Sequence, residues 1–263
     1  MADAADGGSA PLAAAAIALA ATAAVLLALR ACRAKIYDTL IVDLTEGWYA
    51  AVLARLPERA RLLDVGIGTG SALLRPANQE AVKAKRIAVT GVDIDGDYVK
   101  AARAAVEKAG LQPEERPAGA RGGPHGPCVD VRHRSVYDVT RDEDNGGDAW
   151  DAAYFSASLM LVPDPVQALV HVRGLLSPGG TIYVTQTFEG EDAAAASFAS
   201  RLVTAVKPYL KYFVTIDFGT ATFRRDFDAT VKAAKLRVAD EQHLGQRGGA
   251  HRTFKLLVLE DDK

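Results

Sequence analysis

The sequence is poor in the residues that build covalent or metal-held frameworks. It contains two cysteines, Cys32 and Cys128, and five histidines scattered along the chain. Two cysteines this far apart provide neither a disulfide framework nor the close pairs of a zinc site. We therefore expect no metal site, and the scarcity of cysteine favours a reducing compartment.

An excess of basic charge is also missing. The 31 lysines and arginines nearly balance 33 acidic residues, which leaves a net charge of −2. Proteins that bind nucleic acids usually carry a basic surface, so this balance argues against a nucleic-acid partner. A hydrophobic fraction of 49% with 24% charged residues is typical of a globular domain with a sizeable core.

One segment near the N-terminus lacks charge altogether. The run 11–29 is uncharged and, as a helix, just long enough to cross a hydrocarbon core of about 30 Å. Arg30, Arg33 and Lys35 follow it, which by the positive-inside rule places the rest of the chain in the cytosol. We interpret residues 1–35 as an N-terminal extension with a membrane-anchor helix at about 11–29.

The composition of this run keeps two alternatives open. Ten of its 19 residues are alanine, so the apolar side chains favour insertion by only about 2–4 kcal/mol. An organelle-targeting peptide is one alternative, although the first 29 residues contain no arginine. An alanine-rich extension of a soluble cytoplasmic protein is the other.

Beyond residue 35, strand-like and helix-like segments alternate. The predicted strands are 61–65, 87–92, 129–131, 152–156 and 181–185. The predicted helices are 36–56, 69–84, 96–109 and 163–176. This alternation predicts one domain, residues 36–263, in which a parallel sheet has helices on both faces.

The remaining segments complete this domain. Residues 111–127 are rich in proline and glycine and predict an irregular insertion, and 142–148 predicts an acidic loop. Residues 191–207 predict a helix. Two late strands near 236–243 and 253–259 are joined by a connection too short for a parallel crossover, so we expect them to be antiparallel.

A glycine-rich turn follows the first predicted strand. Leu62–Val65 is directly followed by Gly66, Gly68 and Gly70. Glycines allow the backbone to approach a ligand closely, and the start of a following helix presents free N–H groups. The second strand ends in Asp93, where a carboxylate can accept the two hydroxyls of a ribose. Asp95 is interpreted as the cap of the next helix.

These segments resemble the class I S-adenosylmethionine-dependent methyltransferase family over residues 61–187. The resemblance is carried by Leu62–Gly70, which is similar to motif I, and then by Val89–Asp93, Ser135–Asp138, Trp150–Ser156 and Leu175–Thr181, in the family's order. It implies an α/β three-layer sandwich with a seven-stranded, mostly parallel Rossmann-like sheet and an antiparallel last strand. It also implies transfer of a methyl group from S-adenosyl-L-methionine to an acceptor.

The resemblance also implies a set of cofactor-binding residues. These are Asp64, Gly66, Gly68, Gly70, Asp93, Asp138 and Ser156. The first four would surround the methionyl part and the ribose. Asp93 would bind the ribose hydroxyls, Asp138 would face the adenine, and Ser156, followed by Ala157, would lie at the mouth of the active site.

Two other functions stay open on the sequence. A nicotinamide-dinucleotide oxidoreductase would carry the pattern G-x-G-x-x-G, but its third glycine position is occupied by Ser71. A catalytically inactive S-adenosylmethionine-binding protein would keep the same turn without turnover.

The acceptor is inferred only as a class. The predicted anchor favours a small molecule or a lipid. Trp48 and Tyr49 could cover the site or pack in the core, and the aromatic stretch 208–213 could line an acceptor pocket. His243 and His251 are candidate bases, needed only if the acceptor must lose a proton.

Overall fold

The computed structural model describes residues 42–114, 123, 125–190, 222–246 and 253–262. The predicted anchor 11–29, the predicted helix 191–207, the aromatic stretch 208–213 and His251 lie outside the described residues. Within the described part of the chain, no helix combines the length and the apolar character that a membrane crossing requires.

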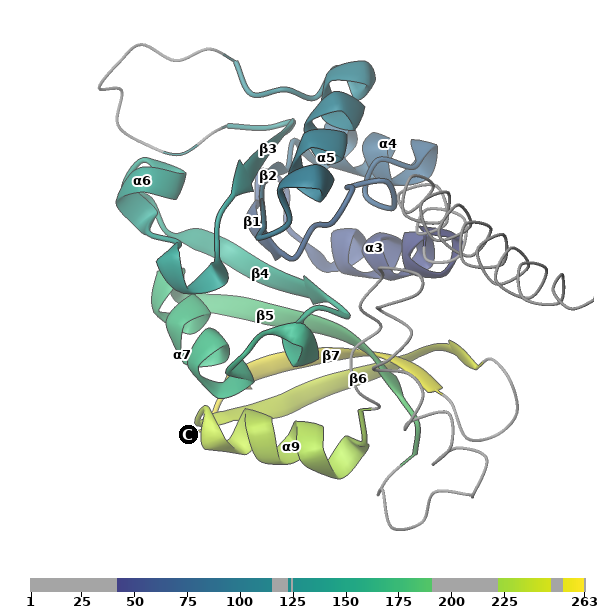
Figure 1. Cartoon of the computed structure of the whole chain (residues 1–263), viewed down its shortest axis with the longest axis vertical. Coiled ribbons are helices and arrows are strands. Elements are labelled where there is room, and N and C mark those ends of the chain that lie inside the picture. The colour runs from purple at the N-terminus through teal and green to yellow at the C-terminus, as the bar shows by residue number, and fades with distance from the viewer. Residues whose placement is uncertain (1–41, 115–122, 124, 191–221, 247–252, 263) are drawn as a thin grey trace, which may run out of the picture.

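Seven strands form one sheet in the order β3-β2-β1-β4-β5-β7-β6 (Figure 1). The strands are β1 (Arg61–Val65), β2 (Ala88–Asp93), β3 (Cys128–His133), β4 (Trp150–Ser156), β5 (Leu176–Phe188), β6 (Leu236–Gln246) and β7 (Thr253–Asp261). The first five run parallel, whereas β7 is antiparallel to both β5 and β6. The predicted sheet, including its antiparallel last strand, is confirmed.

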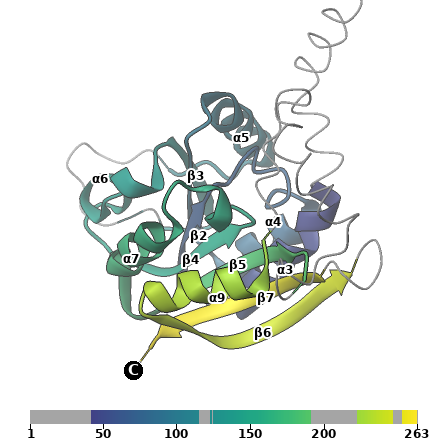
Figure 2. The same cartoon turned by 60° about the horizontal axis from the view of Figure 1, so that its bottom comes forward.

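Helices cover both faces of this sheet (Figures 1 and 2). They are α3 (Asp43–Arg55), α4 (Pro76–Lys85), α5 (Gly96–Ala109), α6 (Arg141–Asn145), α7 (Pro165–Leu175) and α9 (Arg224–Ala233), with one-turn 3-10 helices η2 (Val136–Asp138) and η3 (Leu159–Leu161). Side chains of α3, α4 and α5 pack on one face, and those of α7 and α9 pack on the other. The domain is therefore the predicted three-layer sandwich.

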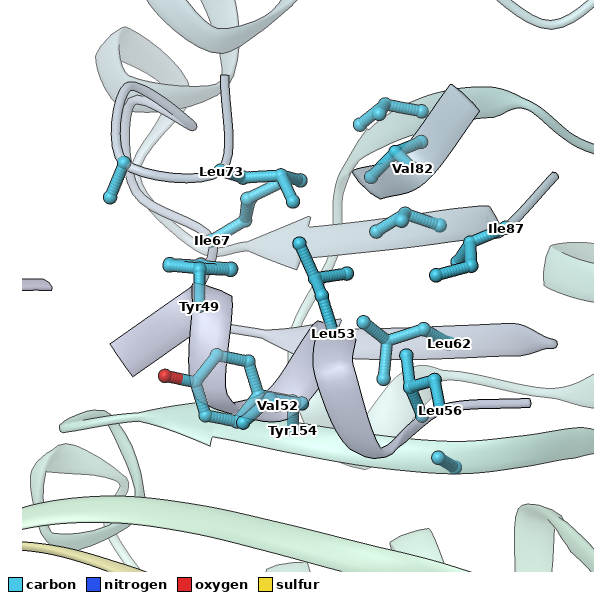
Figure 3. Close-up of a cluster of buried hydrophobic side chains, with 14 of the residues drawn as sticks. Tyr49, Val52, Leu53, Leu56, Leu62, Ile67, Leu73, Val82, Ile87 and Tyr154 are labelled. Carbon is cyan, nitrogen blue, oxygen red and sulfur yellow. The ribbon is translucent and has the colours of Figure 1, made fainter. Parts of the chain in front are cut away.

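The central strands are buried on both faces, which explains their continuous apolar sequences. In β1, Leu62 points into one core cluster and the next residue, Leu63, points into the other, and both are fully buried. Figure 3 shows Leu62 among Leu53 of α3 and Val82 of α4. Burying each such side chain stabilises the fold by roughly 1.5–3 kcal/mol.

The helix predicted from residue 69 begins later than expected. Gly66, Gly68 and Gly70 all have positive φ, so the chain turns irregularly until α4 starts at Pro76. Proline suits the first helical position because its missing N–H has no partner there in any case. The buried Asn78 amide donates to the Ala72 carbonyl at 2.8 Å and holds the irregular stretch against α4.

The acidic stretch predicted as a loop contains a short helix, α6. Thr140 caps it, because its side chain accepts a hydrogen bond from the Glu143 backbone N–H. The three acidic residues of its first turn interact favourably with the helix dipole. The prediction of a loop over 142–148 is therefore wrong for its first half.

Candidate active site

The strand order reverses between β1 and β4, at the centre of the sheet. The connection after β1 leads to β2 on one side, and the connection after β4 leads to β5 on the other. In open parallel sheets, ligands bind outside the carboxyl ends of the strands at this kind of reversal. The register pairs Val65 with Val92 and with Phe155, so the glycine turn, Asp93 and Ser156 lie at one edge.

The glycine turn after β1 has a backbone that other residues rarely adopt. The φ angles are +78° at Gly66, +60° at Gly68 and +66° at Gly70. The Gly66 N–H donates to the Val92 carbonyl at 2.8 Å, which anchors the start of the turn on β2. The three glycines thus permit a tight bend that is fixed to the neighbouring strand.

Asp93, at the end of β2, holds this turn through its side chain. One carboxylate oxygen accepts the Gly68 N–H at 2.9 Å, and the other accepts the Asp95 N–H at 2.8 Å. Each oxygen keeps a second lone pair that can accept another hydrogen bond. Burial raises the pKa of Asp93, whereas these backbone hydrogen bonds lower it. Asp95 in turn accepts the Asp97 and Tyr98 N–H groups, which confirms its predicted role as a helix cap.

Asp64 is a second carboxylate, completely buried beneath the turn. The Tyr49 hydroxyl donates to its Oδ2 atom at 2.8 Å, while its Oδ1 atom has no hydrogen-bond partner among the described residues. Burial raises the pKa of Asp64 to about 7; the Tyr49 hydrogen bond lowers it, and the nearby charge of Asp93 raises it. Asp64 is thus a buried acid whose Oδ1 atom can still accept a hydrogen bond or contact a cation.

The two aromatic residues of α3 belong to the core. Trp48 and Tyr49 are both buried. The Trp48 ring lies 5.7 Å from that of Phe254, and Tyr49 meets Tyr154 edge-on at 5.0 Å. Of the two roles that the sequence left open, the structure favours packing, with the Tyr49 hydroxyl as an added contact to Asp64.

A cavity of about 620 Å³ opens beside the ends of β2 and β3. It is lined by Ile94, His133, Arg134, Ser135, Asp138, Thr140 and Glu143. Ile94, which directly follows Asp93, is 72% exposed and provides apolar surface at a largely polar site. The cavity is therefore lined by the residue that directly follows Asp93, whose carboxylate holds the glycine turn.

Asp138, which the resemblance places beside the adenine, lies beyond the end of the third strand. β3 ends at His133, and Asp138 is the last residue of η2. The Ser135 hydroxyl caps this one-turn helix by accepting the Tyr137 N–H. Asp138 still lines the cavity, because the 3-10 turn brings it back towards the end of the strand.

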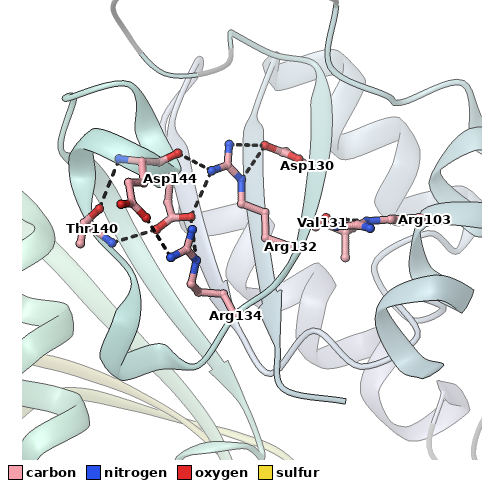
Figure 4. Close-up of polar contacts among 8 residues, drawn as sticks. Arg103, Asp130, Val131, Arg132, Arg134, Thr140 and Asp144 are labelled. Atoms are coloured by element: carbon pink, nitrogen blue, oxygen red, sulfur yellow. Dashed lines mark hydrogen bonds and ion pairs between the residues drawn. The ribbon is translucent and has the colours of Figure 1, made fainter. Parts of the chain in front are cut away.

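The wall of the cavity is held by an ionic network around Asp144 (Figure 4). Asp144 is fully buried, and its carboxylate contacts Arg132 at 3.0 Å, Arg134 at 3.4 Å and the Thr140 N–H at 2.8 Å. Arg132 also pairs with Asp130 at 2.8 Å. Sequence reasoning missed this network, although alternating arginines opposite an acidic stretch are a signal of charge pairing.

Two further residues near the carboxyl ends of the parallel strands match no sequence motif. His133 Nε2 lies 2.9 Å from the Ile94 carbonyl oxygen, so it supports the loop that exposes Ile94. Ser158, in the loop after β4, forms a hydrogen bond with the Val65 carbonyl. A single histidine or serine in a loop matches no motif, because its role depends on which distant segment packs against it.

Ser156 and His243 illustrate which predicted residues the fold brings together. Ser156 ends β4, the neighbour of β1, and is half-buried near the glycine turn. His243 is exposed on β6, four strand positions from β1, and strands are spaced by about 4.8 Å. The structure therefore does not bring His243 to the glycine turn. No group of histidine, cysteine or acidic side chains among the residues it describes is arranged to hold a metal ion.

The comparison with known families agrees with this geometry. A model of the methyltransferase domain family matches residues 42–213, more than half of the chain. The chain belongs to this family. The predicted resemblance to S-adenosylmethionine-dependent methyltransferases is thereby confirmed, and with it the prediction of a methyltransferase enzyme.

The names of individual relatives differ in the atom that is methylated, oxygen in one and nitrogen in another. A ubiquinone biosynthesis O-methyltransferase of Xanthomonas campestris pv. campestris is 29% identical over 195 residues, which cover 74% of this chain and 67% of the relative. A phosphatidylethanolamine N-methyltransferase of Cereibacter sphaeroides is 24% identical and covers 64% of this chain and 70% of its own length.

The fold is shared more widely than the reaction. The crystal structure of the [4+2]-cyclase SpnF superimposes with a TM-score of 0.58 at 19% identity and covers 82% of this chain and 81% of its own. At this identity, the likeness concerns the fold alone. The function must be argued from the site.

Proposed function

We propose that this methyltransferase binds S-adenosyl-L-methionine at the glycine turn and in the adjoining cavity, and transfers the methyl group to a small molecule or a lipid. The observation that carries the proposal is the Asp93 carboxylate. It is hydrogen-bonded to the Gly68 N–H and stands next to the exposed Ile94 of the cavity. This supports the inference that the glycine turn and the cavity are two parts of one nucleotide-binding site.

The residues present fit this cofactor in three respects. A cavity of about 620 Å³ falls within the usual range of ligand sites, roughly 300–1,000 Å³. Asp93 has lone pairs left for the ribose hydroxyls, and Ile94 and Asp138 can provide the apolar and polar contacts of a purine. The Oδ1 atom of Asp64, which has no hydrogen-bond partner in the described part of the chain, suits the ammonium group of the methionyl part.

The chain's own contribution to the reaction is mainly one of position. Bound S-adenosyl-L-methionine would supply an electrophilic methyl group. The residues Asp64, Asp93 and the glycine turn would orient the donor, and the loop after Ser156 would orient the acceptor. Alignment of this kind contributes on the order of 7–11 kcal/mol to a reaction barrier. The proposal assigns no general base, since an acceptor that is already nucleophilic needs none.

A lipophilic acceptor is the favoured class within this proposal. The relatives are named for a quinone pathway and for a phospholipid, and this chain carries the uncharged run 11–29 ahead of its catalytic domain. An anchor would keep the active site, in the cytosol, next to a membrane-borne acceptor. A soluble or organelle-targeted protein with a small polar acceptor is the alternative.

The binding proposal is tested by calorimetric titration of the full chain. We expect S-adenosylhomocysteine to bind with micromolar affinity, and a nicotinamide dinucleotide not to bind. Transfer of a labelled methyl group to quinol, phospholipid and small-thiol acceptors then measures turnover. Binding of the dinucleotide alone would contradict the proposal. Tight binding of S-adenosylhomocysteine without transfer to any acceptor would favour the inactive binding protein.

Asp93→Ala should weaken binding of S-adenosylhomocysteine by about 1–3 kcal/mol, roughly 5- to 150-fold, because it removes a charged acceptor. Asp93→Asn keeps one oxygen and should lose less. Asp97→Ala removes an exposed carboxylate from the first turn of α5, four residues from Asp93, and is the matched control. Titration of the three variants measures the effect, and unchanged affinity in Asp93→Ala contradicts the assignment.

A further inference from the structure

Ser158 lies just beyond the carboxyl end of β4, next to the glycine turn that follows β1. It belongs to the loop after β4, on which an acceptor would be placed, and its side chain reaches back to β1. Although Ser158 stands at the N-cap position of η3, its side chain makes no capping hydrogen bond there. Instead, the Ser158 hydroxyl donates to the Val65 carbonyl, immediately before the glycine turn.

The contact between Ser158 and the turn is also steric. A Cβ atom added at Gly66 would lie 2.6 Å from Ser158 Cβ, closer than real Cβ atoms approach, and 3.1 Å from its Oγ. Ser158 is itself 92% buried, with 8% of its surface exposed, so it has little room to move away. The absence of a side chain at Gly66 therefore lets the loop after β4 pack directly on the turn.

The backbone next to Ser158 is strained in a way that this packing explains. Ala157 has a φ of +56°, a conformation that costs a residue with a Cβ atom roughly 1–3 kcal/mol. It is held by a hydrogen bond from its N–H to the Thr185 carbonyl at 2.9 Å. Strain of this kind persists only where the surrounding contacts force the conformation. At Ala157 these contacts come from both sides, because the residue lies between the end of β4 and the packed Ser158.

We propose that Ser158 is a positioning residue that locks the glycine turn to the loop after β4. The hydroxyl holds the end of β1, and the Cβ atom packs against Gly66. The donor side and the acceptor side of the site are therefore kept in a fixed position relative to each other. The part of this proposal that concerns the cofactor rests on the proposed function. The part that concerns the turn itself does not.

Hydrogen exchange of the protein without ligand tests the structural half. The Gly66 and Ile67 amides both donate to the Val92 carbonyl, at 2.8 and 3.2 Å, and report directly on the turn. In Ser158→Ala we expect these amides to exchange at least tenfold faster. Val231→Ala, a buried truncation on α9, lowers stability at a remote site and serves as the control. Exchange within twofold of the unaltered protein, or equal acceleration in Val231→Ala, overturns the proposal.

Titration with S-adenosylhomocysteine tests the functional half. Ser158→Ala should raise its dissociation constant by about five- to tenfold, while Val231→Ala leaves it within twofold. Ser158→Thr keeps the hydroxyl and should restore most of the affinity and the slow exchange, which a merely space-filling role would not explain. Equal affinity in Ser158→Ala and the unaltered protein overturns this half. If the unaltered protein does not bind S-adenosylhomocysteine, the proposed function fails, and the exchange rates still decide whether Ser158 holds the turn.

Discussion

Asp64 and Asp93 lie close together near the ends of neighbouring strands, yet their surroundings differ. Asp93 accepts two backbone N–H groups, whereas Asp64 accepts one tyrosine hydroxyl and is completely buried. The pKa of Asp64 is therefore raised to about 7, mainly by loss of water, against an ordinary value of 3.8. The folded protein holds this proton at pH values where the unfolded chain releases it.

This difference predicts a pH dependence of stability. Because the folded state binds the extra proton, the free energy of unfolding should fall as the pH rises from about 4 to about 7, by up to about 4 kcal/mol from this group. Asp64→Asn should remove that slope. Urea denaturation between pH 4 and 8 measures it, with Asp97→Asn as the exposed control. An identical slope in Asp64→Asn contradicts the prediction.

At the scale of elements, the connection from β3 to α6 determines the shape of the cavity. Its residues 134–140 contain no regular element longer than the one-turn η2, so their position depends on contacts made by side chains. The buried Asp144 makes these contacts to Arg132, Arg134 and Thr140 (Figure 4). A buried carboxylate with two arginines and a backbone N–H is strongly held, and losing it removes the buried partner that Arg132 and Arg134 share.

Removing the charge at the centre of this network should therefore be costly. We expect Asp144→Asn to lower the free energy of unfolding by about 2–4 kcal/mol. Glu143→Gln removes an exposed partner of Arg134 in the same helix and should cost less than about 1 kcal/mol. Urea denaturation of both variants gives the comparison. Equal, small losses would show that Asp144 is not central to the wall.

At the scale of the whole molecule, the active site lies in the domain that follows the uncharged run 11–29. The sheet edge that carries the glycine turn is built from segments spread over residues 61–158, so the proposed cofactor-binding residues all lie outside this run. If the proposed anchor forms, the run determines where the enzyme works, and its role is separable from cofactor binding.

Membrane attachment by this run can be tested with one substitution. Leu19→Arg, at the centre of the run, adds about 2.5–3.5 kcal/mol to the cost of insertion, which offsets the estimated gain of about 2–4 kcal/mol. We expect it to reduce co-sedimentation of the full chain with phospholipid vesicles at least fivefold. Ala4→Arg adds the same charge outside the run and should leave binding unchanged. Failure of the unaltered chain to co-sediment rules out the anchor.

The features that the sequence predicted correctly arise from local physics. Strands such as β1 are apolar on both faces, and Asp95 caps the helix that directly follows it. The positive-φ glycines also follow from local sequence, because few other residues adopt that backbone. These signals extend over a few residues, and their order along the chain was sufficient to indicate the parallel sheet.

The remaining features were decided by tertiary contacts. Tyr49 meets Asp64 across 15 positions of sequence, and Ser158 meets Val65 across 93. Asp138 reaches the cavity through a turn after β3 and not from the strand's end. Local patterns carry no information on such pairs, since a contact depends on the packing of two segments that the sequence alone does not align. The sequence by itself determined the elements and the glycine turn, and the packing determined which side chains complete the site around it.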